Sequence, residues 1–253
     1  MKREGYRVTA DFEATHWWFL SRRDLFLAQL EKAARDLGFP GRRLSLLDFG
    51  CGTGFYLRFL ARYGDVTGAD RFGGELDRFW KGNGCERIDS SELGDRHRGC
   101  FDVVTALDVL EHLDDDAAGL DRLAKLLAPR GQIILTVPAY TWLWGGEDEI
   151  SGHRRRYSKR SLLAVSALAG LEPLFFSHFN LGILPAMAAV IAFRKAIAGK
   201  GAKRSNLRAV PGPVNRLLYR LTSMEARMVG REKAALPAGA SIVCRLRKKR
   251  TVS

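Results

Sequence analysis

The sequence has few cysteines and no pattern that would join them. Its 253 residues include four, and none of them forms a Cys-x-x-Cys pair: Cys51, Cys85, Cys100 and Cys244. This spacing argues against a zinc site or a disulfide framework and favours free thiols in a reducing compartment. The first residues, Met1–Gly5, are charged and lack the apolar core of a secretion signal. We therefore expect a cytoplasmic chain.

Acidic residues are scarce in the second part of the chain. Residues 1–150 carry 20 Lys and Arg against 25 Asp and Glu, whereas residues 151–253 carry 21 against 3. The whole net charge of +13 is thus C-terminal. A cationic surface of this size predicts an anionic partner, such as a phospholipid surface, a phosphorylated lipid carrier or nucleic acid. The alternative is a solvated basic surface that only aids solubility.

One stretch without charge is long enough to suggest a membrane span. No charged residue stands between Pro173 and Phe193, but two prolines, His178 and Asn180 interrupt the stretch, and we reject a span. Residues 181–193 instead predict an apolar helix, and lysines and arginines follow it. That pattern is typical of a segment in an anionic membrane interface. Burial of the same helix against the sheet is the alternative.

The sequence does contain a glycine-rich turn between a strand pattern and a helix pattern. The apolar run Leu44–Phe49 leads directly into Gly50, Gly52 and Gly54. Such a turn presents backbone N–H groups to a nucleotide-like ligand. Phe55 replaces the third glycine of a dinucleotide fingerprint, and the Gly-Lys-Ser/Thr of a phosphate-binding loop is absent. The alternative is a tight structural turn without a ligand.

The next strand pattern, at residues 65–70, ends on Asp70, 22 residues after Asp48. A carboxylate at the end of the second strand can accept hydrogen bonds from two ribose hydroxyls. We therefore expect Asp70 to bind the ribose of a nucleoside.

Strand and helix patterns alternate along most of the chain. Further strands are expected at 86–90, 101–106, 132–137, 171–178 and 240–246, and helices at 11–38, 55–63, 73–79, 117–127, 159–168, 181–193 and 214–229. This alternation predicts a parallel, doubly wound α/β sheet with its ligand outside the carboxyl ends of the strands.

Three segments together resemble the motifs of class I S-adenosylmethionine (SAM) dependent methyltransferases. They are Asp48–Gly54, the Phe-Asp-x-Val of 101–104 and the Leu-Glu-His of 110–112. The resemblance implies a Rossmann-like, seven-stranded sheet with an antiparallel last strand and a helical insertion, 179–235, before that strand. It implies one domain, 1–253, with an N-terminal helical cap (1–40), a cofactor-binding core (41–138) and an acceptor-side loop (139–160).

The same resemblance implies roles for individual residues. Residues of the glycine turn would line the methionine and ribose of SAM: Asp48, Gly50, Cys51, Gly52 and Gly54. Asp70 would hold the ribose hydroxyls, Asp89 and Ser90 would meet the adenine, and Leu107 would pack on the cofactor. Arg22 is expected to bind the cofactor as the partner of a carboxylate, with the aromatic residues Trp17–Phe19 as a lid against it. Burial of the aromatic cluster within the packed helix is the more frequent explanation of such residues.

An aromatic and acidic segment without periodicity, 138–149, precedes a basic cluster. It predicts a pocket for an amphipathic acceptor formed by Trp144 and Tyr157, with Arg155 and Arg156 on an anionic group. The alternative is a solvated face on which residues 154–156 pair with the acids of 147–149.

His112 and His153 are the candidate proton acceptors, since imidazole titrates near neutral pH. Asp108-x-x-Glu111-His112 also resembles the Glu-x-x-Glu-His of ubiquinone-pathway O-methyltransferases, where these side chains can hold a divalent cation. Methyltransferases without a metal share Leu-Glu-His as well, and we expect no metal here.

The sequence thus predicts methyl transfer from SAM, leaving S-adenosylhomocysteine, to a small-molecule or lipid- or glycan-linked acceptor. Oxygen is the favoured methyl-accepting atom, and the inner face of an anionic membrane is the expected place. RNA methylation is a rival because of the basic half, but the Asn/Asp-Pro-Pro-Tyr of base-amine methylation is absent after the fourth strand. A protein that binds SAM without turnover is the third reading.

Overall fold

The chain folds around one seven-stranded mixed sheet. The computed structural model describes residues 9–71, 85–198 and 210–249, and the sheet has the strand order β3-β2-β1-β4-β5-β7-β6. Strand β7 is antiparallel to both of its neighbours, whereas the other pairs are parallel. The predicted fold class is therefore confirmed. The strands are β1 (Leu44–Phe49), β2 (Gly64–Asp70), β3 (Glu86–Asp89), β4 (Phe101–Leu107), β5 (Leu127–Pro138), β6 (Leu171–Phe179) and β7 (Ser241–Lys248).

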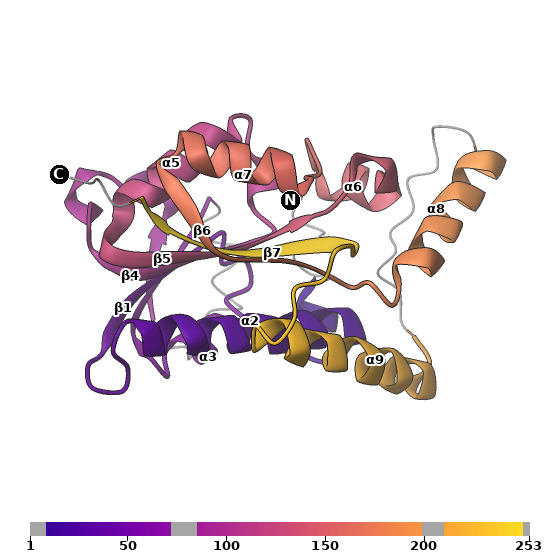
Figure 1. The fold of residues 1–253 in the computed structure, drawn as a ribbon, viewed down its shortest axis with the longest axis horizontal. Helices are drawn as coiled ribbons and strands as arrows, with labels where there is room; N and C mark the ends of the chain where they lie inside the picture. The colour runs from indigo at the N-terminus through magenta and orange to yellow at the C-terminus, as the bar shows by residue number, and fades with distance from the viewer. Residues whose placement is uncertain (1–8, 72–84, 199–209, 250–253) are drawn as a thin grey trace.

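Helices cover both faces of this sheet (Figure 1). On one face lie α2 (Trp17–Asp36), α3 (Leu57–Leu60) and α9 (Gly212–Gly230). On the other lie α5 (Asp116–Leu126) and α7 (Lys159–Leu168), which the short α6 (Gly146–Ser151) precedes. Cover on both faces explains the nearly continuous apolar strands, because a parallel sheet has no face open to water.

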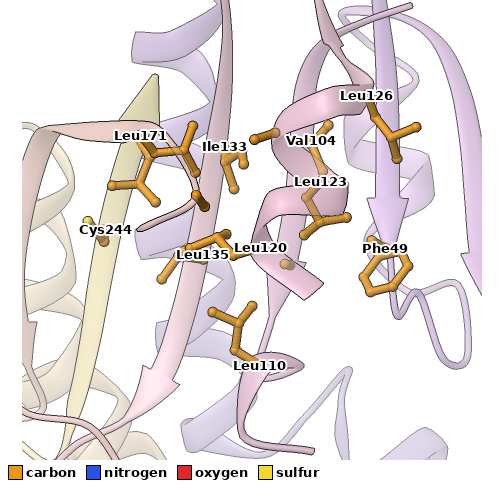
Figure 2. Close-up of a cluster of buried hydrophobic side chains, with 14 of the residues drawn as sticks. Phe49, Val104, Leu110, Leu120, Leu123, Leu126, Ile133, Leu135, Leu171 and Cys244 are labelled. Carbon is orange, nitrogen blue, oxygen red and sulfur yellow. The ribbon is translucent and has the colours of Figure 1, made fainter. Parts of the chain in front are cut away.

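The sheet divides the buried side chains into two cores, one on each of its faces. Leu47, Val104 and Ile133 share one buried cluster with Leu120 and Leu123 of α5. Figure 2 shows Val104 and Ile133 beside these α5 side chains. Their neighbours in sequence point to the opposite face and pack against α2; these are Leu46, Val103 and Ile134. Successive side chains of a strand alternate in direction, so each short apolar run supplies both cores.

Some predicted boundaries are wrong. The helix expected at 55–63 is the four-residue α3, because Gly54 to Tyr56 form a turn and Tyr63 already accepts a hydrogen bond from Leu44 N at the start of β1. The segment 139–160 is not free of regular structure, since it holds a 3₁₀ turn, Thr141–Leu143, and α6. The helix expected at 73–79 lies outside the described residues.

Within the described residues, two helices follow β6 and precede β7. These are α8 (Leu184–Ala198) and α9, and α8 stands beyond the end of the sheet (Figure 1). Among the described residues, no helix combines the length and the apolar character needed to cross a membrane. Helix α9 lies along α2, where Tyr219 Oη donates to Asp24 Oδ2 at 2.7 Å and Gln29 Nε2 donates to Gly230 O at 3.0 Å. The last part of the chain thus braces the first long helix.

Candidate functional site

The glycine turn after β1 has a backbone shape that other residues rarely adopt. Gly50, Gly52 and Gly54 have φ values of 78°, 53° and 77°, in the left-handed region that favours glycine. A Cβ on Gly50 would lie 2.5 Å from Cγ2 of Val109, in the segment after β4. Cys51 between the glycines is buried. The turn therefore packs directly against the chain that leads to Glu111 and His112.

Asp70 lies at this turn, as its position at the end of β2 predicts. Its Oδ2 accepts a hydrogen bond from Gly52 N at 2.8 Å, and its Oδ1 accepts one from Arg71 N at 2.6 Å. The parallel register places Asp70 beside Asp89 of β3. The structure thus brings the predicted ribose and adenine residues to one edge of the sheet, and their contacts with a cofactor stay predictions.

The other predicted residues of the nucleoside side are held by local contacts. Asp89 Oδ1 accepts hydrogen bonds from Ser91 N at 2.8 Å and Ser91 Oγ at 2.5 Å, and these bonds lower the pKa of the Asp89 carboxyl. Ser90 is buried, and its carbonyl oxygen accepts from Arg122 at 2.6 Å. Leu107, the last residue of β4, is half-buried beside the α2 face of the core.

Asp48 is a buried carboxyl at the base of the turn. Thr105 Oγ1 donates to its Oδ1 at 2.6 Å, while Oδ2 has no hydrogen-bond partner within the described part of the chain. Burial raises the pKa of Asp48 to about 6, and the nearby Asp70 charge adds to the rise, against the Thr105 hydrogen bond. A cationic ligand beside this carboxyl would favour its charged form.

Replacing Asp48 by Asn should stabilise the ligand-free protein at high pH only. The pKa of about 6 in the folded chain lies above the ordinary value of 3.8, so stability due to this group is full below about pH 4 and is lost as pH rises through 6. We therefore expect Asp48→Asn to change the free energy of unfolding more favourably at pH 8 than at pH 4, by about 3 kcal/mol. This figure follows from a pKa difference of roughly two units between the folded and unfolded chain. Urea unfolding at both pH values measures this difference. An equal effect at both would refute it, and the exposed Asp65→Asn is the control.

The N-terminal segment supplies a contact that sequence reasoning missed. Thr53 Oγ1, inside the glycine turn, donates to Glu13 Oε2 at 2.6 Å. Burial raises the pKa of Glu13, against the Thr53 hydrogen bond. Glu13 thus lies beside the turn. Glu13 carries no signal that separates it from other acids of the first forty residues, because its partner is distant in sequence.

Arg22 is engaged by the protein itself. Its guanidinium pairs with Asp108, donates to Ser241 Oγ at 3.1 Å, and lies 5.1 Å from the centre of the Trp18 ring. Asp108 has a φ of 56°, in the left-handed region that residues other than glycine adopt infrequently. Arg22 is thus paired with Asp108 inside the chain, and its expected role as the partner of a carboxylate in cofactor binding stays a prediction.

Glu111, His112 and His153 form a cluster beyond the end of β4. Arg154 N donates to Glu111 O at 2.8 Å, which lays this part of the chain along Glu111 and His112. The two imidazole rings consequently meet edge to face with their centres 4.8 Å apart. His153 Nδ1 lies 2.8 Å from Asp148 Oδ1, while its Nε2 lies 3.9 Å from Glu111 Oε1. Both candidate proton acceptors are thus brought together.

The electrostatics of this cluster are unusual. Glu111 is fully buried, and neither carboxyl oxygen has a hydrogen-bond partner within the described ranges. Burial, together with the Asp108 charge, raises its pKa well above the ordinary value. Burial and the His153 charge lower the pKa of His112 to about 4, which keeps this imidazole neutral at neutral pH. Unpartnered buried carboxyls and shifted pKa values are typical of functional sites.

One carboxylate and two imidazoles could also hold a divalent cation. The ligand atoms of Glu111, His112 and His153 lie within 4.8 Å of one another. Asp108, the first residue of the metal-binding pattern, instead pairs with Arg22. This geometry does not test our expectation that the protein binds no metal.

The predicted acceptor residues are tied into the protein. Arg156 donates from two nitrogens to Asp148, at 2.7 and 3.0 Å, and Arg155 pairs with Asp116 at 2.7 Å. Tyr157 is buried and its hydroxyl donates to Asp116 Oδ2 at 2.7 Å. Arg156 therefore supports His153 through Asp148, whereas Arg155 and Tyr157 meet at Asp116. The contact of these residues with an acceptor stays a prediction. Trp144 is half-buried. The alternative pairing with 147–149 is realised by Asp148, but inside the protein and not on a solvated face.

Comparisons with known proteins agree with this geometry. A family model described as a methyltransferase domain matches residues 19–174. The ubiquinone biosynthesis O-methyltransferase of Psychrobacter cryohalolentis is 35% identical over 125 residues, which cover 46% of this chain and 48% of that protein. The match thus spans about half the length of this curated relative.

Solved structures agree on the fold. A putative sarcosine dimethylglycine methyltransferase from Galdieria sulphuraria superposes with a TM-score of 0.54 at 17% identity, covering 87% of this chain and 84% of that one. A SAM-dependent methyltransferase from Archaeoglobus fulgidus gives 0.53 at 18% identity, covering 89% and 94%. The matched family domain takes in the sheet from β1 to β5 and the glycine turn with Asp70 at its edge. The chain therefore belongs to the family of class I SAM-dependent methyltransferases.

Proposed function

We propose that this protein transfers a methyl group from SAM to an oxygen of a small amphipathic acceptor. The contact of Gly50 with Val109 carries the proposal, because it joins the glycine turn to the chain segment of Glu111 and His112. The predicted cofactor residues and the two histidines thereby share the carboxyl ends of β1 and β4. The similarity to O-methyltransferases of ubiquinone biosynthesis supports oxygen as the accepting atom.

The residues present suit the cofactor. The turn leaves no Cβ at Gly50, Gly52 or Gly54, Asp70 offers carboxylate oxygens for hydroxyl groups, and the unpartnered Oδ2 of Asp48 suits a cationic ligand. When bound, SAM supplies an activated methyl group on a sulfonium. The chain's own task is to align the acceptor and to exclude water.

His153 is the better placed of the two proton acceptors. Asp148 contacts its Nδ1, and Arg156 holds Asp148 in turn with two hydrogen bonds. A carboxylate at one ring nitrogen fixes the ring and leaves the other nitrogen to accept a proton. In the proposed step the acceptor hydroxyl passes its proton to this imidazole as the oxygen–methyl bond forms and the sulfur–methyl bond breaks.

Replacing His153 by Gln should lower kcat by roughly 10²-fold to 10⁴-fold, the usual contribution of a proton acceptor. His112→Gln should have the same effect if His112 takes the proton. Calorimetric titration with S-adenosylhomocysteine provides the control, since cofactor affinity should stay unchanged in both variants. Full turnover in both variants would show that neither histidine accepts the proton.

The proposed acceptor is lipid- or glycan-linked and is met at an anionic membrane surface. The apolar segment 181–193 and the C-terminal excess of positive charge support this part of the proposal. A membrane surface would concentrate an amphipathic acceptor beside the enzyme.

Transfer of a deuterated methyl group tests the reaction itself. The purified protein is incubated with SAM labelled in its methyl group and with a lipid extract, a water-soluble extract or total RNA of the source cells. Mass spectrometry should find the label in a molecule of the lipid extract. Label in RNA would favour the rival reaction, and label that stays on bound SAM in every mixture would indicate a binding protein without turnover.

A further inference from the structure

Helix α9 turns its large apolar side chains outward. Leu217, Leu221 and Met224 each leave more than half of the side chain exposed, and Val214 and Met228 are also exposed. The spacing of these five residues, alternating between three and four, places them in one line along the helix. Apart from Val229, the residues buried on the opposite side are small or polar: Thr222, Ser223, Ala226 and Gly230. We call the exposed line the α9 stripe.

The helix is held in this orientation by contacts along its inner side. Asn215 accepts a hydrogen bond from Trp17 N and donates one to Thr15 O, both at 2.9 Å. At the other end, a Cβ on Gly230 would lie 2.6 Å from the Cβ of Ala28, so α9 and α2 approach closely there. Rotation of α9 to bury its stripe would break these contacts.

The charges beside the stripe favour an anionic partner. Helix α9 contains Arg216, Arg220 and Arg227, all exposed, and its one acid is Glu225. Glu225 is turned to the body of the protein, where it accepts hydrogen bonds from Leu181 N at 3.0 Å and Gly182 N at 3.3 Å. The outer side of α9 therefore combines apolar side chains with positive charge alone.

This charge distribution favours a lipid surface over a second copy of the chain as the partner of the α9 stripe. Two stripes packed against each other would bring Arg220 and Arg227 of both copies near one another, and like charges at a helix interface are destabilising. An anionic phospholipid surface offers the apolar side chains a hydrocarbon boundary and offers the arginines negative headgroups. Helix α8 exposes Val190 and Phe193 separately from this stripe.

We propose that the α9 stripe and its arginines dock on an anionic phospholipid surface. This face is distinct from the segment 181–193 and would place α2, which α9 braces, close to the membrane (Figure 1). Docking does not require methyl transfer. Its test is therefore separate from that of the proposed reaction.

Vesicle flotation of the full chain tests the docking face. The vesicles contain phosphatidylcholine alone or an equimolar mixture with phosphatidylglycerol. The wild-type protein should float with the mixed vesicles only. A double variant, Leu217→Glu with Leu221→Glu, should lower the partition coefficient at least tenfold. A second double variant, Arg216→Gln with Arg220→Gln, should lower it about 25-fold, because each cation near the surface contributes roughly fivefold.

Matched controls lie on α7, which covers the other face of the sheet. Leu168 is 78% exposed, and Arg160 is exposed as well, so Leu168→Glu and Arg160→Gln make the same chemical changes elsewhere and should leave flotation unchanged. Affinity for S-adenosylhomocysteine should be the same in all four variants, which shows that each is folded.

Three results would overturn the proposal. Wild-type protein that binds neither vesicle excludes docking. Loss of binding in Phe193→Glu but not in the α9 variants would assign the membrane contact to α8. A wild-type dimer in light scattering that Leu217→Glu with Leu221→Glu converts to a monomer would identify a second copy as the partner of the stripe.

Discussion

Replacing Asp70 by Ala should raise the Kd for S-adenosylhomocysteine on the order of 100-fold. In the proposed complex this carboxylate accepts hydrogen bonds from two ribose hydroxyls while it holds the turn through Gly52 N at 2.8 Å. Hydrogen bonds to a charged group contribute about 1.5–3 kcal/mol each, and a loss near 3 kcal/mol corresponds to roughly 100-fold in affinity. Isothermal titration calorimetry measures the change.

Asp65→Ala is the matched control for this experiment. Asp65 lies at the other end of the same strand, is 82% exposed and pairs with Arg43 on the surface. Its loss should change neither the Kd nor the unfolding temperature beyond experimental error. An Asp70→Ala variant that is folded and binds as tightly as the Asp65→Ala control would remove Asp70 from the cofactor site.

Replacing Asp148 by Ala should destabilise the protein by about 3–5 kcal/mol, because it leaves Arg156 as a buried charge without its partner. Both side chains are almost entirely buried, and they meet through two hydrogen bonds. Burial alone would raise the pKa of Asp148, but the hydrogen bonds from His153 and Arg156 outweigh it and lower that pKa. For a chain of this size the expected fall in Tm is on the order of 10 °C, measured by calorimetry.

Two further variants separate the loss of a pair from the exposure of a buried charge. Asp114→Ala removes the partner of Arg154, but Asp114 is 82% exposed, and we expect a change within about 0.5 kcal/mol. Adding Arg156→Met to Asp148→Ala should restore part of the lost stability, since the uncompensated charge is then gone. A double variant less stable than Asp148→Ala would contradict this explanation.

The fold follows from the sequence wherever a pattern is local. The apolar run Leu44–Phe49 is β1 and the pattern Lys159–Leu168 is α7, because strand and helix periods are recorded in neighbouring residues. The helix after the glycine turn is shorter than its pattern, since Phe55 and Tyr56 continue the turn and pack as aromatic rings against each other. Periodicity does not record where such a turn ends.

The site was predictable where it depends on strand order and not where it depends on distant partners. Asp48, Asp70 and the glycines meet because the carboxyl ends of neighbouring parallel strands form one edge. The Glu13–Thr53 contact depends on how distant loops fold back, which residue types alone do not reveal. A pairing of residues 154–156 with the acids of 147–149 was an alternative from the sequence, but the burial of the Arg156–Asp148 pair and its contact with His153 were not evident.

Helix α9 shows a second limit of pattern reasoning. Its regular apolar spacing predicts a helix and says nothing of which side faces the protein. The outward stripe results from the small inner residues, such as Ala226 and Gly230, which let α9 approach α2 closely. Contact with α2 therefore decides the orientation, and it involves residues about two hundred positions away.

The structure of the complex with S-adenosylhomocysteine tests the central claim most directly. We expect the ribose hydroxyls within hydrogen-bond distance of Asp70 and the adenine beside Asp89 and Ser90. The sulfur should lie on the side that leads to Glu111, His112 and His153. A nucleoside bound away from the glycine turn, or a sulfur that points away from the two histidines, would contradict the proposed site.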